Sequence, residues 1–298
     1  MRAKRVGVMA AVVGYGRSAM AVSVPALAAL GCQPCAMPTA VLSSHPGGFQ
    51  FFQMQDMTEQ LERQIDHYKR EQIDMDALMT GYLYNIHQQE LAMRFISEQR
   101  GRCLSRVLID PVMGDNGTPY KIITPELMDG MRELVRHADI ITPNMSEACW
   151  LLGRKFTREA ISRDEAMDMV RALSALGPKQ VVITSARVEE GWANLYYDAD
   201  AHEQGTVAYE ALERQYPGTG DLFAAVLMGS VLERGVGIEE AIRRAGGFVY
   251  RAVKRTMALN TPTREGVQFE MLLECVSKIP EYAISGGAVP FLRHQPST

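Results

Sequence analysis

Apolar residues along the 298-residue chain gather in short continuous runs that alternate with longer amphipathic stretches. Continuous apolar runs are typical of strands buried on both faces of a sheet, whereas apolar residues spaced three or four apart indicate helices. Predicted strands cover 6–13, 36–41, 77–80, 107–109, 140–142 and 180–184, with a later antiparallel pair at 192–198 and 206–209. Predicted helices cover 18–30, 56–71, a stretch ending near 98, a segment from 124, 146–152, 162–177, and segments from 221, 238 and about 267. This alternation predicts an α/β fold, in which a mostly parallel central sheet carries helices on both faces.

Residues that start helices support these assignments. Asp56-Met57-Thr58-Glu59 and Ser162-Arg163-Asp164-Glu165 have the spacing of capping boxes, and Thr124-Pro125-Glu126 combines an N-cap with a proline at the first helical position. The segment 43–55 is expected to be a loop, because it is rich in polar residues, glycine and aromatics. The chain contains no linker, low-complexity segment or internal repeat, so residues 1–298 are expected to form a single domain.

Composition and charge argue against several classes of protein. With a net charge of −4 and no block of basic residues, a nucleic-acid-binding surface is not expected. No apolar run approaches the ~18–20 residues that cross a bilayer. The basic N-terminus leads into an apolar stretch that Gly14-Tyr15-Gly16 interrupts, which fits a buried first strand better than a signal peptide. We therefore expect a cytoplasmic protein.

The segment Tyr216-Pro217-Gly218-Thr219-Gly220-Asp221 stands directly before an apolar run that predicts a buried helix. Glycine permits backbone conformations barred to other residues and leaves peptide N–H groups uncovered. The first turn of a helix has unpaired N–H donors and a partial positive charge, so this turn is a candidate seat for a phosphoryl group. Asp221 would then accept a proton from an attacking hydroxyl. Alternatively, Asp221 only caps the helix and the glycines only shape the loop.

Acidic and amide side chains follow two other predicted strands. Asp110-Pro111-Val112-Met113-Gly114-Asp115 follows the strand at 107–109, and Thr142-Pro143-Asn144-Met145-Ser146-Glu147 follows the next one. Ligands of parallel sheets bind beyond the carboxyl ends of the strands. Taken alone, Asn144 is equally well a turn residue and Glu147 a first-turn helix acid. Together with the glycine-rich turn, they indicate a phosphate site with Mg²⁺, an ion that keeps several waters and takes few protein ligands.

Two short motifs suggest other functions. Gly14-Tyr15-Gly16-Arg17-Ser18-Ala19 matches the dinucleotide-binding fingerprint, but the acid required at the end of the second strand is missing, since no acidic residue precedes Asp56. Cys32-Gln33-Pro34-Cys35 has redox spacing, but it enters a strand instead of opening a helix, so its thiols are expected to be free and structural. A Walker A pattern is absent, which argues against a P-loop kinase.

Gly218-Thr219-Gly220-Asp221, followed by a helix of small residues, resembles the catalytic signature of the ribokinase-like (PfkB) superfamily. The three ordered motifs at 110–120, 142–147 and 218–221 resemble the pyridoxal kinase branch of that superfamily, as do Gly81-Tyr82-Leu83 and residues 264–270. The resemblance covers nearly the whole chain. It implies a three-layer ribokinase-like fold and ATP-dependent phosphorylation of the 5′-hydroxymethyl group of pyridoxal, pyridoxine or pyridoxamine. It also implies Mg²⁺ and a homodimer, and leaves a requirement for a monovalent cation open.

The same resemblance assigns roles to residues. Asp221 is the expected general base, and the amides of Gly218, Thr219 and Gly220 form the expected anion hole. Residues Asn144 and Glu147 match an Asn-x-x-Glu element that organises Mg²⁺ and its waters. The metal site is expected at Glu147 and Asp110; the nucleotide site at Asp110, Asp115, Tyr120, Asn144, Thr184 and Ser185; and the vitamer pocket at His45, Tyr82 and Val13.

The chain departs from the pyridoxal kinase branch where the vitamer is expected to bind. Many pyridoxal kinases present a serine at the end of the first strand, where this chain has Val13, and the substrate-loop pattern Ser-Asn-His-Thr reads Ser43-Ser44-His45-Pro46. Lost hydrogen-bonding side chains reduce discrimination between acceptors by on the order of a few kcal/mol. A hydroxymethylpyrimidine kinase of the same superfamily is therefore an alternative, and so is a catalytically silent vitamin-binding protein on this fold.

Overall fold

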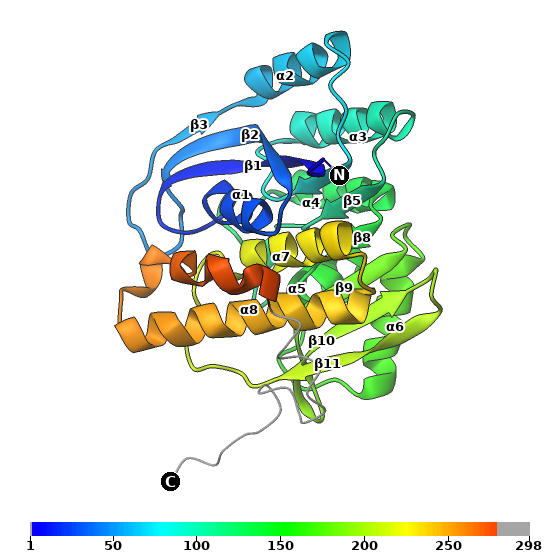
Figure 1. The fold of residues 1–298 in the computed structure, drawn as a ribbon. Coiled ribbons are helices and arrows are strands. Elements are labelled where there is room, and N and C mark those ends of the chain that lie inside the picture. Colours follow the sequence, from blue (N-terminus) through cyan, green and yellow to red (C-terminus); the bar gives the residue numbers. More distant parts are fainter. Residues whose placement is uncertain (1, 279–298) are drawn as a thin grey trace.

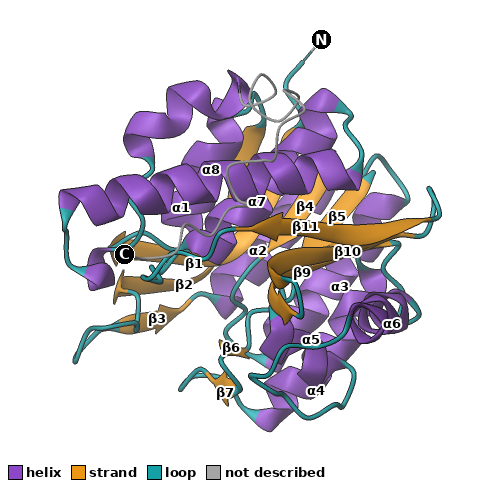
Figure 2. Ribbon diagram, turned by 90° about the horizontal axis from the view of Figure 1, so that it is seen from below, coloured by secondary structure: helices purple, strands orange, loops and turns teal. Residues whose placement is uncertain are grey.

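Nine strands form one sheet within residues 2–278, the part of the chain that the computed structural model describes (Figures 1 and 2). In spatial order they are β11 (Glu203–Tyr209), β10 (Gly191–Asp198), β9 (Gln180–Val188), β8 (Ile140–Ile141), β5 (Arg106–Ile109), β4 (Ala77–Thr80), β1 (Arg5–Tyr15), β2 (Gln33–Ser44) and β3 (Met54–Asp56). Neighbouring strands from β2 to β9 pair in parallel, whereas β3 at one edge and β10 and β11 at the other pair antiparallel. The carboxyl ends of the parallel strands therefore lie together at one end of the sheet.

Helices cover both faces of the sheet (Figure 2). One face carries α1 (Met20–Ala29), α7 (Thr219–Arg234) and α8 (Ile238–Leu259), and the other carries α2 (Thr58–Arg70), α3 (Ile86–Arg100), α4 (Pro125–Leu134), α5 (Met145–Leu151) and α6 (Arg163–Ser174). Three 3₁₀ segments complete the described helices: η1 (Val135–His137), η2 (Thr263–Glu265) and η3 (Glu270–Lys278). The hairpin of β6 (Gly114–Asp115) and β7 (Thr118–Pro119) forms a separate two-stranded sheet.

The central strands divide their side chains between two hydrophobic cores. In β4, Ala77 and Met79 join the core beneath α1, α7 and α8, whereas Leu78 joins the core beneath the other helices. Successive residues of a strand point to opposite faces, so a strand covered on both sides favours apolar residues on both faces. This explains why the buried central strands read as continuous apolar runs.

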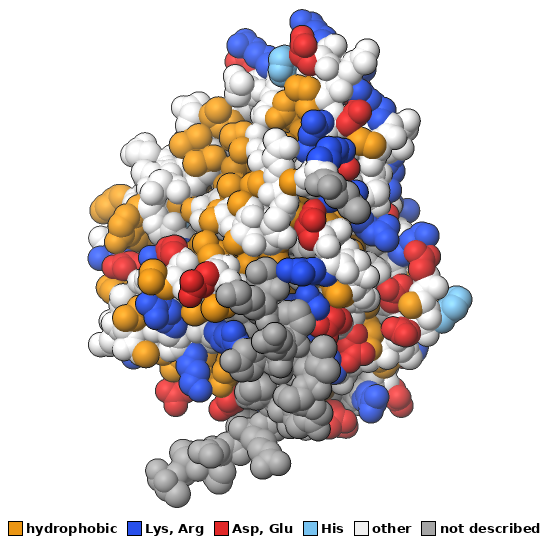
Figure 3. Space-filling model, in the orientation of Figure 1, with side chains coloured by type: hydrophobic (Ala, Val, Ile, Leu, Met, Phe, Trp, Pro, Cys, Tyr) orange, Lys and Arg blue, Asp and Glu red, His pale blue; other side chains and the backbone are white. Residues whose placement is uncertain are grey.

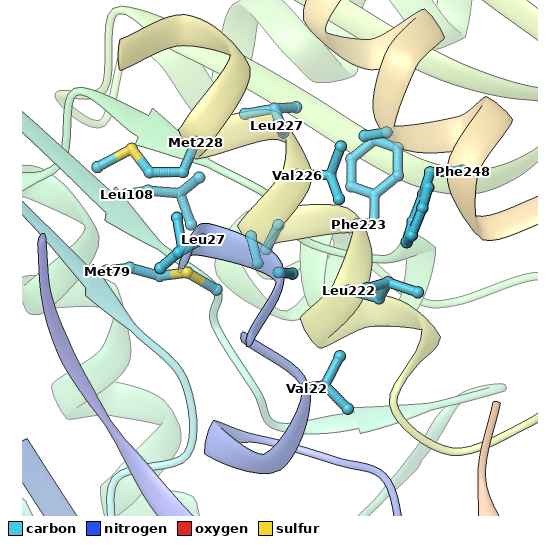
Figure 4. Close-up of a cluster of buried hydrophobic side chains, with 14 of the residues drawn as sticks. Val22, Leu27, Met79, Leu108, Leu222, Phe223, Val226, Leu227, Met228 and Phe248 are labelled. Carbon is cyan, nitrogen blue, oxygen red and sulfur yellow. The ribbon is translucent and has the colours of Figure 1, made fainter. Parts of the chain in front are cut away.

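Helix α7 is buried along most of its length. Residues 222–230 are all buried, so the helix has no solvent-facing side over this stretch. In Figure 4, Met228 lies beside Leu108 of β5, while Phe223 lies beside Phe248 of α8. The position of the residues at the amino end of α7 is therefore fixed by packing on both the sheet and α8.

The predicted α/β fold with a mostly parallel sheet is confirmed, and several details differ. Asp56 does not form a capping box, because its carboxylate accepts the Thr58 amide and α2 begins without a side-chain cap. The predicted strand at 180–184 continues to Val188, and the helix expected from about 267 is the 3₁₀ segment η3. By contrast, Thr124 and Ser162 do cap α4 and α6.

Acidic and basic side chains are interspersed on the face shown in Figure 3. No helix within residues 2–278 combines the length and apolar character needed to cross a membrane. The expectation of a single domain stays a prediction, and it extends over residues 279–298, which lie outside the described residues.

Candidate active site

Three adjacent strands, β4, β5 and β8, bring polar residues to the carboxyl end of the sheet. Thr80 ends β4, Asp110 follows β5, and Thr142 follows β8. All three are buried, and the Asp110 amide donates to the Thr80 carbonyl across 3.2 Å. Parallel pairing in this strand order places Asp110 between the two threonines. The carboxylate of Asp110 is thus held at the centre of the sheet's carboxyl end.

The amino end of α7 approaches this end of the sheet. Gly218 is the N-cap of α7 with φ of 83°, and the Leu222 amide donates to the Gly218 carbonyl at 2.9 Å. The amides of the residues between them lie in the first turn, where no helical acceptor is available. Oδ1 of Asp221 lies 3.9 Å from the position that a Cβ on Gly81 would occupy, just past β4. Asp221 therefore faces the same end of the sheet as Asp110.

Buried carboxylates dominate the electrostatics of this region. Burial, followed by the charges of Glu147 and Asp221, raises the pKa of Asp110 well above its ordinary value. Burial also raises the pKa of Asp221, and it raises the pKa of Glu147 to about 8. Asp110 responds to the charges of Glu147 and Asp221, so it lies within electrostatic reach of both carboxylates. Carboxylates gathered in this way favour the binding of a cation.

Asn144 and Glu147 fix the start of α5 and the β6–β7 hairpin together. Asn144 caps α5 through its Oδ1, and Oε2 of Glu147 accepts the Asn144 amide at 2.9 Å, which completes a capping box. Oε1 of Glu147 accepts the Met113 amide at 2.9 Å, while Nδ2 of Asn144 donates to the Gly114 carbonyl at 2.8 Å. The capping box thus also anchors the chain that leads into the hairpin.

Asp115 and Tyr120 lie on and just after that hairpin. Burial raises the pKa of Asp115, whose Oδ1 accepts the Asn116 amide at 2.7 Å. The Tyr120 side chain remains partly exposed, and its pKa is raised by burial and by the charges of the carboxylates around it, Glu147 and Asp115 before Asp110 and Asp221. Tyr120 is therefore within electrostatic reach of all the acids of the site.

The sequence predicted that the strand ends at Thr184. In the structure Thr184 lies beside Asn144, and the strand β9 continues past Thr184 and Ser185 to Val188. The Thr184 amide donates to the Pro143 carbonyl at 2.8 Å, and Thr184 forms a parallel bridge with Asn144. Ser185 has a φ of 55°, and its amide donates to Oδ1 of Asn194 at 3.2 Å. A register shift in β10 accompanies this contact, so the strand bulges at Ser185 and continues.

Both ring nitrogens of His45 are used within the chain. Nδ1 accepts the Gly47 amide at 3.1 Å, so Nε2 carries the proton and donates to the Arg264 carbonyl at 2.8 Å. Burial lowers the pKa of His45, and the ring packs edge-on against Phe49. A Cβ on Gly16 would lie 2.6 Å from the His45 ring. The second glycine of the dinucleotide-like motif therefore makes room for His45.

Tyr82 and Val13, the other residues expected in the vitamer pocket, are buried. The Tyr82 carbonyl accepts the Thr39 hydroxyl at 2.8 Å, and burial raises the pKa of Tyr82 to about 12. Val13 lies in β1, paired with Leu42 of β2. Both residues belong to the same core as Leu222 and Phe223 of α7. Their side chains offer mainly apolar surface.

Sequence reasoning missed two features of this site. The Ala19 amide donates to Oδ2 of Asp221 at 2.8 Å, and Arg17 contacts the segment 265–270. Their only local signal was the motif Gly14–Ala19, which suggested a nucleotide cofactor instead.

The cysteines agree with expectation: Cys32 and Cys35 are free, and burial raises the pKa of Cys32 to about 12, whereas a redox thiol has a lowered pKa.

No group of three or more His, Cys, Asp or Glu side chains within residues 2–278 is arranged to chelate a metal ion on its own. Both oxygens of Glu147 already accept backbone amides. This donor set fits Mg²⁺ that is held mainly by phosphate oxygens and water, with carboxylates compensating its charge.

Comparisons with known proteins identify a family and similar structures. Residues 22–266 match the family model described as phosphomethylpyrimidine kinase. The chain is 30% identical over 275 residues to the pyridoxine/pyridoxal/pyridoxamine kinase of Bordetella avium, covering 85% of this chain and 88% of that one. A structure of a phosphomethylpyrimidine kinase homologue from Bacteroides thetaiotaomicron with pyridoxal is 32% identical, with a TM-score of 0.87 over 92% of this chain and 96% of that one. The pyridoxal kinase of Leishmania donovani in complex with ADP and pyridoxamine is 23% identical, with a TM-score of 0.79 over 92% and 95% of the two chains, and shares the fold.

Proposed function

This chain belongs to the phosphomethylpyrimidine kinase family, and we propose that within it the protein is a pyridoxal kinase, which transfers the γ-phosphoryl group of ATP to the 5′-hydroxymethyl group of pyridoxal, pyridoxine or pyridoxamine. One observation carries the proposal. Asp221 and the free amides at the start of α7 face the same end of the sheet as Asp110. The Bordetella relative is named for all three vitamers, and the Bacteroides relative holds pyridoxal, which supports this choice of acceptor.

The proposed mechanism assigns proton transfer to Asp221. Its carboxylate accepts the proton of the acceptor hydroxyl as that oxygen bonds to the γ-phosphorus, and the bond between the γ-phosphorus and the bridging oxygen breaks to release ADP. A raised pKa suits a general base, because it brings the carboxylate closer to the working pH. The amides of Gly218, Thr219 and Gly220 donate to the phosphoryl oxygens, on which negative charge develops.

The nucleotide and its metal would lie over the acidic cluster. Asp110 and Glu147 would hold Mg²⁺, directly or through water, next to the triphosphate. The ion would neutralise phosphate charge and compensate carboxylates whose pKa values are raised by burial and mutual repulsion. Contacts to the nucleotide are assigned to Asp110, Asp115, Tyr120, Asn144, Thr184 and Ser185, all at or beside the carboxyl end of the sheet.

The acceptor would bind where Val13, His45 and Tyr82 lie. Both ring nitrogens of His45 form hydrogen bonds with the backbone. His45 would therefore contact the phosphoryl acceptor through the face or edge of its ring, and not through a hydrogen bond. The family resemblance further supports a single-domain, cytoplasmic homodimer. Sedimentation equilibrium tests the dimer, and a monomer across the working concentration range would contradict it.

A hydroxymethylpyrimidine kinase is the second candidate function. It is favoured by the family model that matches this chain and by the apolar Val13 side chain. A coupled assay of ADP formation with each of the three vitamers and with hydroxymethylpyrimidine discriminates between the two. We expect a higher kcat/KM for at least one vitamer than for hydroxymethylpyrimidine. The reverse order would assign the second function, and vitamer binding without ADP formation would identify a catalytically silent binding protein.

A further inference from the structure

The loop between β1 and α1 is held by the side chain of Arg17. Nη1 of Arg17 donates to the Glu265 carbonyl at 3.2 Å, Nη2 donates to Oε1 of Gln268 at 3.1 Å, and Nε donates to the Glu270 carboxylate. The Arg17 amide also donates to the Glu265 carbonyl at 3.2 Å. A residue near the start of the chain is thereby fixed to a segment near the end of the described chain.

The backbone of this loop is packed between two glycines. The Arg17 carbonyl oxygen lies 2.1 Å from the position of a Cβ on Gly218 and 2.7 Å from that of a Cβ on Gly266, and both glycines have positive φ. Such close approach is possible only because neither residue carries a side chain. The loop cannot shift toward either neighbour.

Two residues beyond Arg17, Ala19 has a backbone conformation that alanine rarely adopts. Its φ is 49° and its ψ is −128°, close to the first central position of a type II′ turn, where glycine is strongly preferred. Residues in such conformations persist when the surrounding structure imposes them, and they are frequent at functional sites. Here the conformation turns the Ala19 amide onto Oδ2 of Asp221 at 2.8 Å.

This contact gives the two carboxylate oxygens of Asp221 different surroundings. Oδ2 of Asp221 is occupied by the Ala19 amide, whereas Oδ1 faces Gly81 at the end of β4. The amide therefore fixes the rotation of the carboxylate and leaves one oxygen directed toward the end of the sheet. A general base needs this orientation, because proton transfer requires alignment with the hydroxyl.

We propose that Arg17 is a positioning residue, whose contacts with residues 265–270 hold Ala19 in its strained conformation and thereby aim the carboxylate of Asp221. The proposal rests on the function proposed above. When the contacts of Arg17 are lost, Ala19 relaxes to an ordinary conformation and its amide turns away from Asp221. Chemistry then slows, while nucleotide binding is unchanged, because the Arg17 side chain is directed at the segment 265–270.

The test compares steady-state kinetics of a small set of variants. For Arg17→Ala we expect kcat to fall about tenfold, equivalent to about 1.4 kcal/mol in the barrier, with KM for ATP within about twofold because no ATP contact is lost. Adding Ala19→Gly should restore most of the loss, since glycine adopts the required conformation without support. Adding Asp221→Asn should give a double variant no slower than Asp221→Asn alone, because residues that act as a unit are not additive.

Controls separate this inference from general damage and from the proposed function. Arg63→Ala removes an exposed arginine on α2 and should leave kcat unchanged. Where Arg17→Ala fails to fold, Arg17→Lys keeps the positive charge, cannot reach all three acceptors, and carries the same comparisons. Hydrogen exchange of the peptide covering residues 18–23 should accelerate in Arg17→Ala, a result independent of activity.

Two outcomes would overturn the inference. One is failure of Ala19→Gly to restore kcat in the Arg17→Ala background. The other is a loss from Arg17→Ala that adds in full to the loss from Asp221→Asn. If the wild-type chain phosphorylates none of the acceptors, the proposed function fails, and the exchange measurement still decides whether Arg17 holds Ala19.

Discussion

Substituting Gly218 by alanine should destabilise the protein much more than the same change at Gly220, two residues along the chain. Gly218 has a positive φ, and its new Cβ would lie 2.1 Å from the Arg17 carbonyl oxygen. The left-handed conformation costs alanine about 1–2 kcal/mol, and forcing a methyl group into a packed site costs about 1–3 kcal/mol. We therefore expect the free energy of unfolding to fall by about 2–5 kcal/mol, since both terms apply at Gly218.

Gly220 is the matched control within the same turn. It has no positive φ, and a Cβ there would meet nothing within 4 Å. Alanine at Gly220 should therefore leave the melting temperature within about 2 °C, whereas Gly218→Ala should lower it by roughly 4–20 °C, at about 2–4 °C per kcal/mol. If the triphosphate occupies the open space at Gly220, Gly220→Ala should still lower kcat/KM for ATP.

Differential scanning calorimetry and the coupled kinase assay together test this reasoning. Equal melting temperatures for the two variants would refute the close approach of Arg17 to Gly218. Unchanged kcat/KM in Gly220→Ala would instead contradict the placement of the phosphate at the start of α7.

Three further changes test other parts of the site. Asp221→Asn should lower kcat by ~10² or more with ADP binding by calorimetry unchanged; near-wild-type turnover would remove Asp221 from the base role. Gln88 is fully buried, donates to the Thr39 carbonyl and accepts the Tyr84 amide. Gln88→Ala should therefore lower the free energy of unfolding, measured in urea, by about 2–4 kcal/mol. A loss below ~1 kcal/mol would contradict a stabilising role for these two hydrogen bonds. The pKa of Glu147 is raised from 4.5 to about 8, so the unfolded chain releases this proton at lower pH than the folded protein. Stability without ligands should therefore decline as pH rises through this range, and Glu147→Gln should flatten the decline; an identical slope in that variant would exclude Glu147 as its source.

Local sequence patterns predicted a strand well where all of its residues are buried. The strand 77–80 was predicted with the bounds that β4 has, because every residue in it is buried. The edge strand β3 escaped prediction, since its three residues, Met54–Asp56, include no buried side chain to create a pattern. The extension of β9 was also missed, because a bulge at Ser185 allows a polar pair within a continuing strand.

The acids and glycines of the site were visible in the sequence, but the contacts that orient them were not. Asp110, Glu147 and Asp221 stand beside strand or helix ends, where residue type and position already suggest chemistry. The hydrogen bond from Ala19 to Asp221 joins residues far apart in the chain, as does that from His45 to Arg264. Only the tertiary fold creates such pairs, and alanine carries no side-chain signal at all.

The order of synthesis matters for this molecule, because segment 16–19 leaves the ribosome early and segment 264–270, which contacts it, leaves late. A nascent polypeptide halted before residue 264 would possess every strand of the sheet and the carboxylates Asp110, Glu147 and Asp221. It would still lack residues 264–270, whose hydrogen bonds hold the side chains of Arg17 and His45. Phosphoryl transfer should consequently reach its full rate only late in translation, after the scaffold is complete.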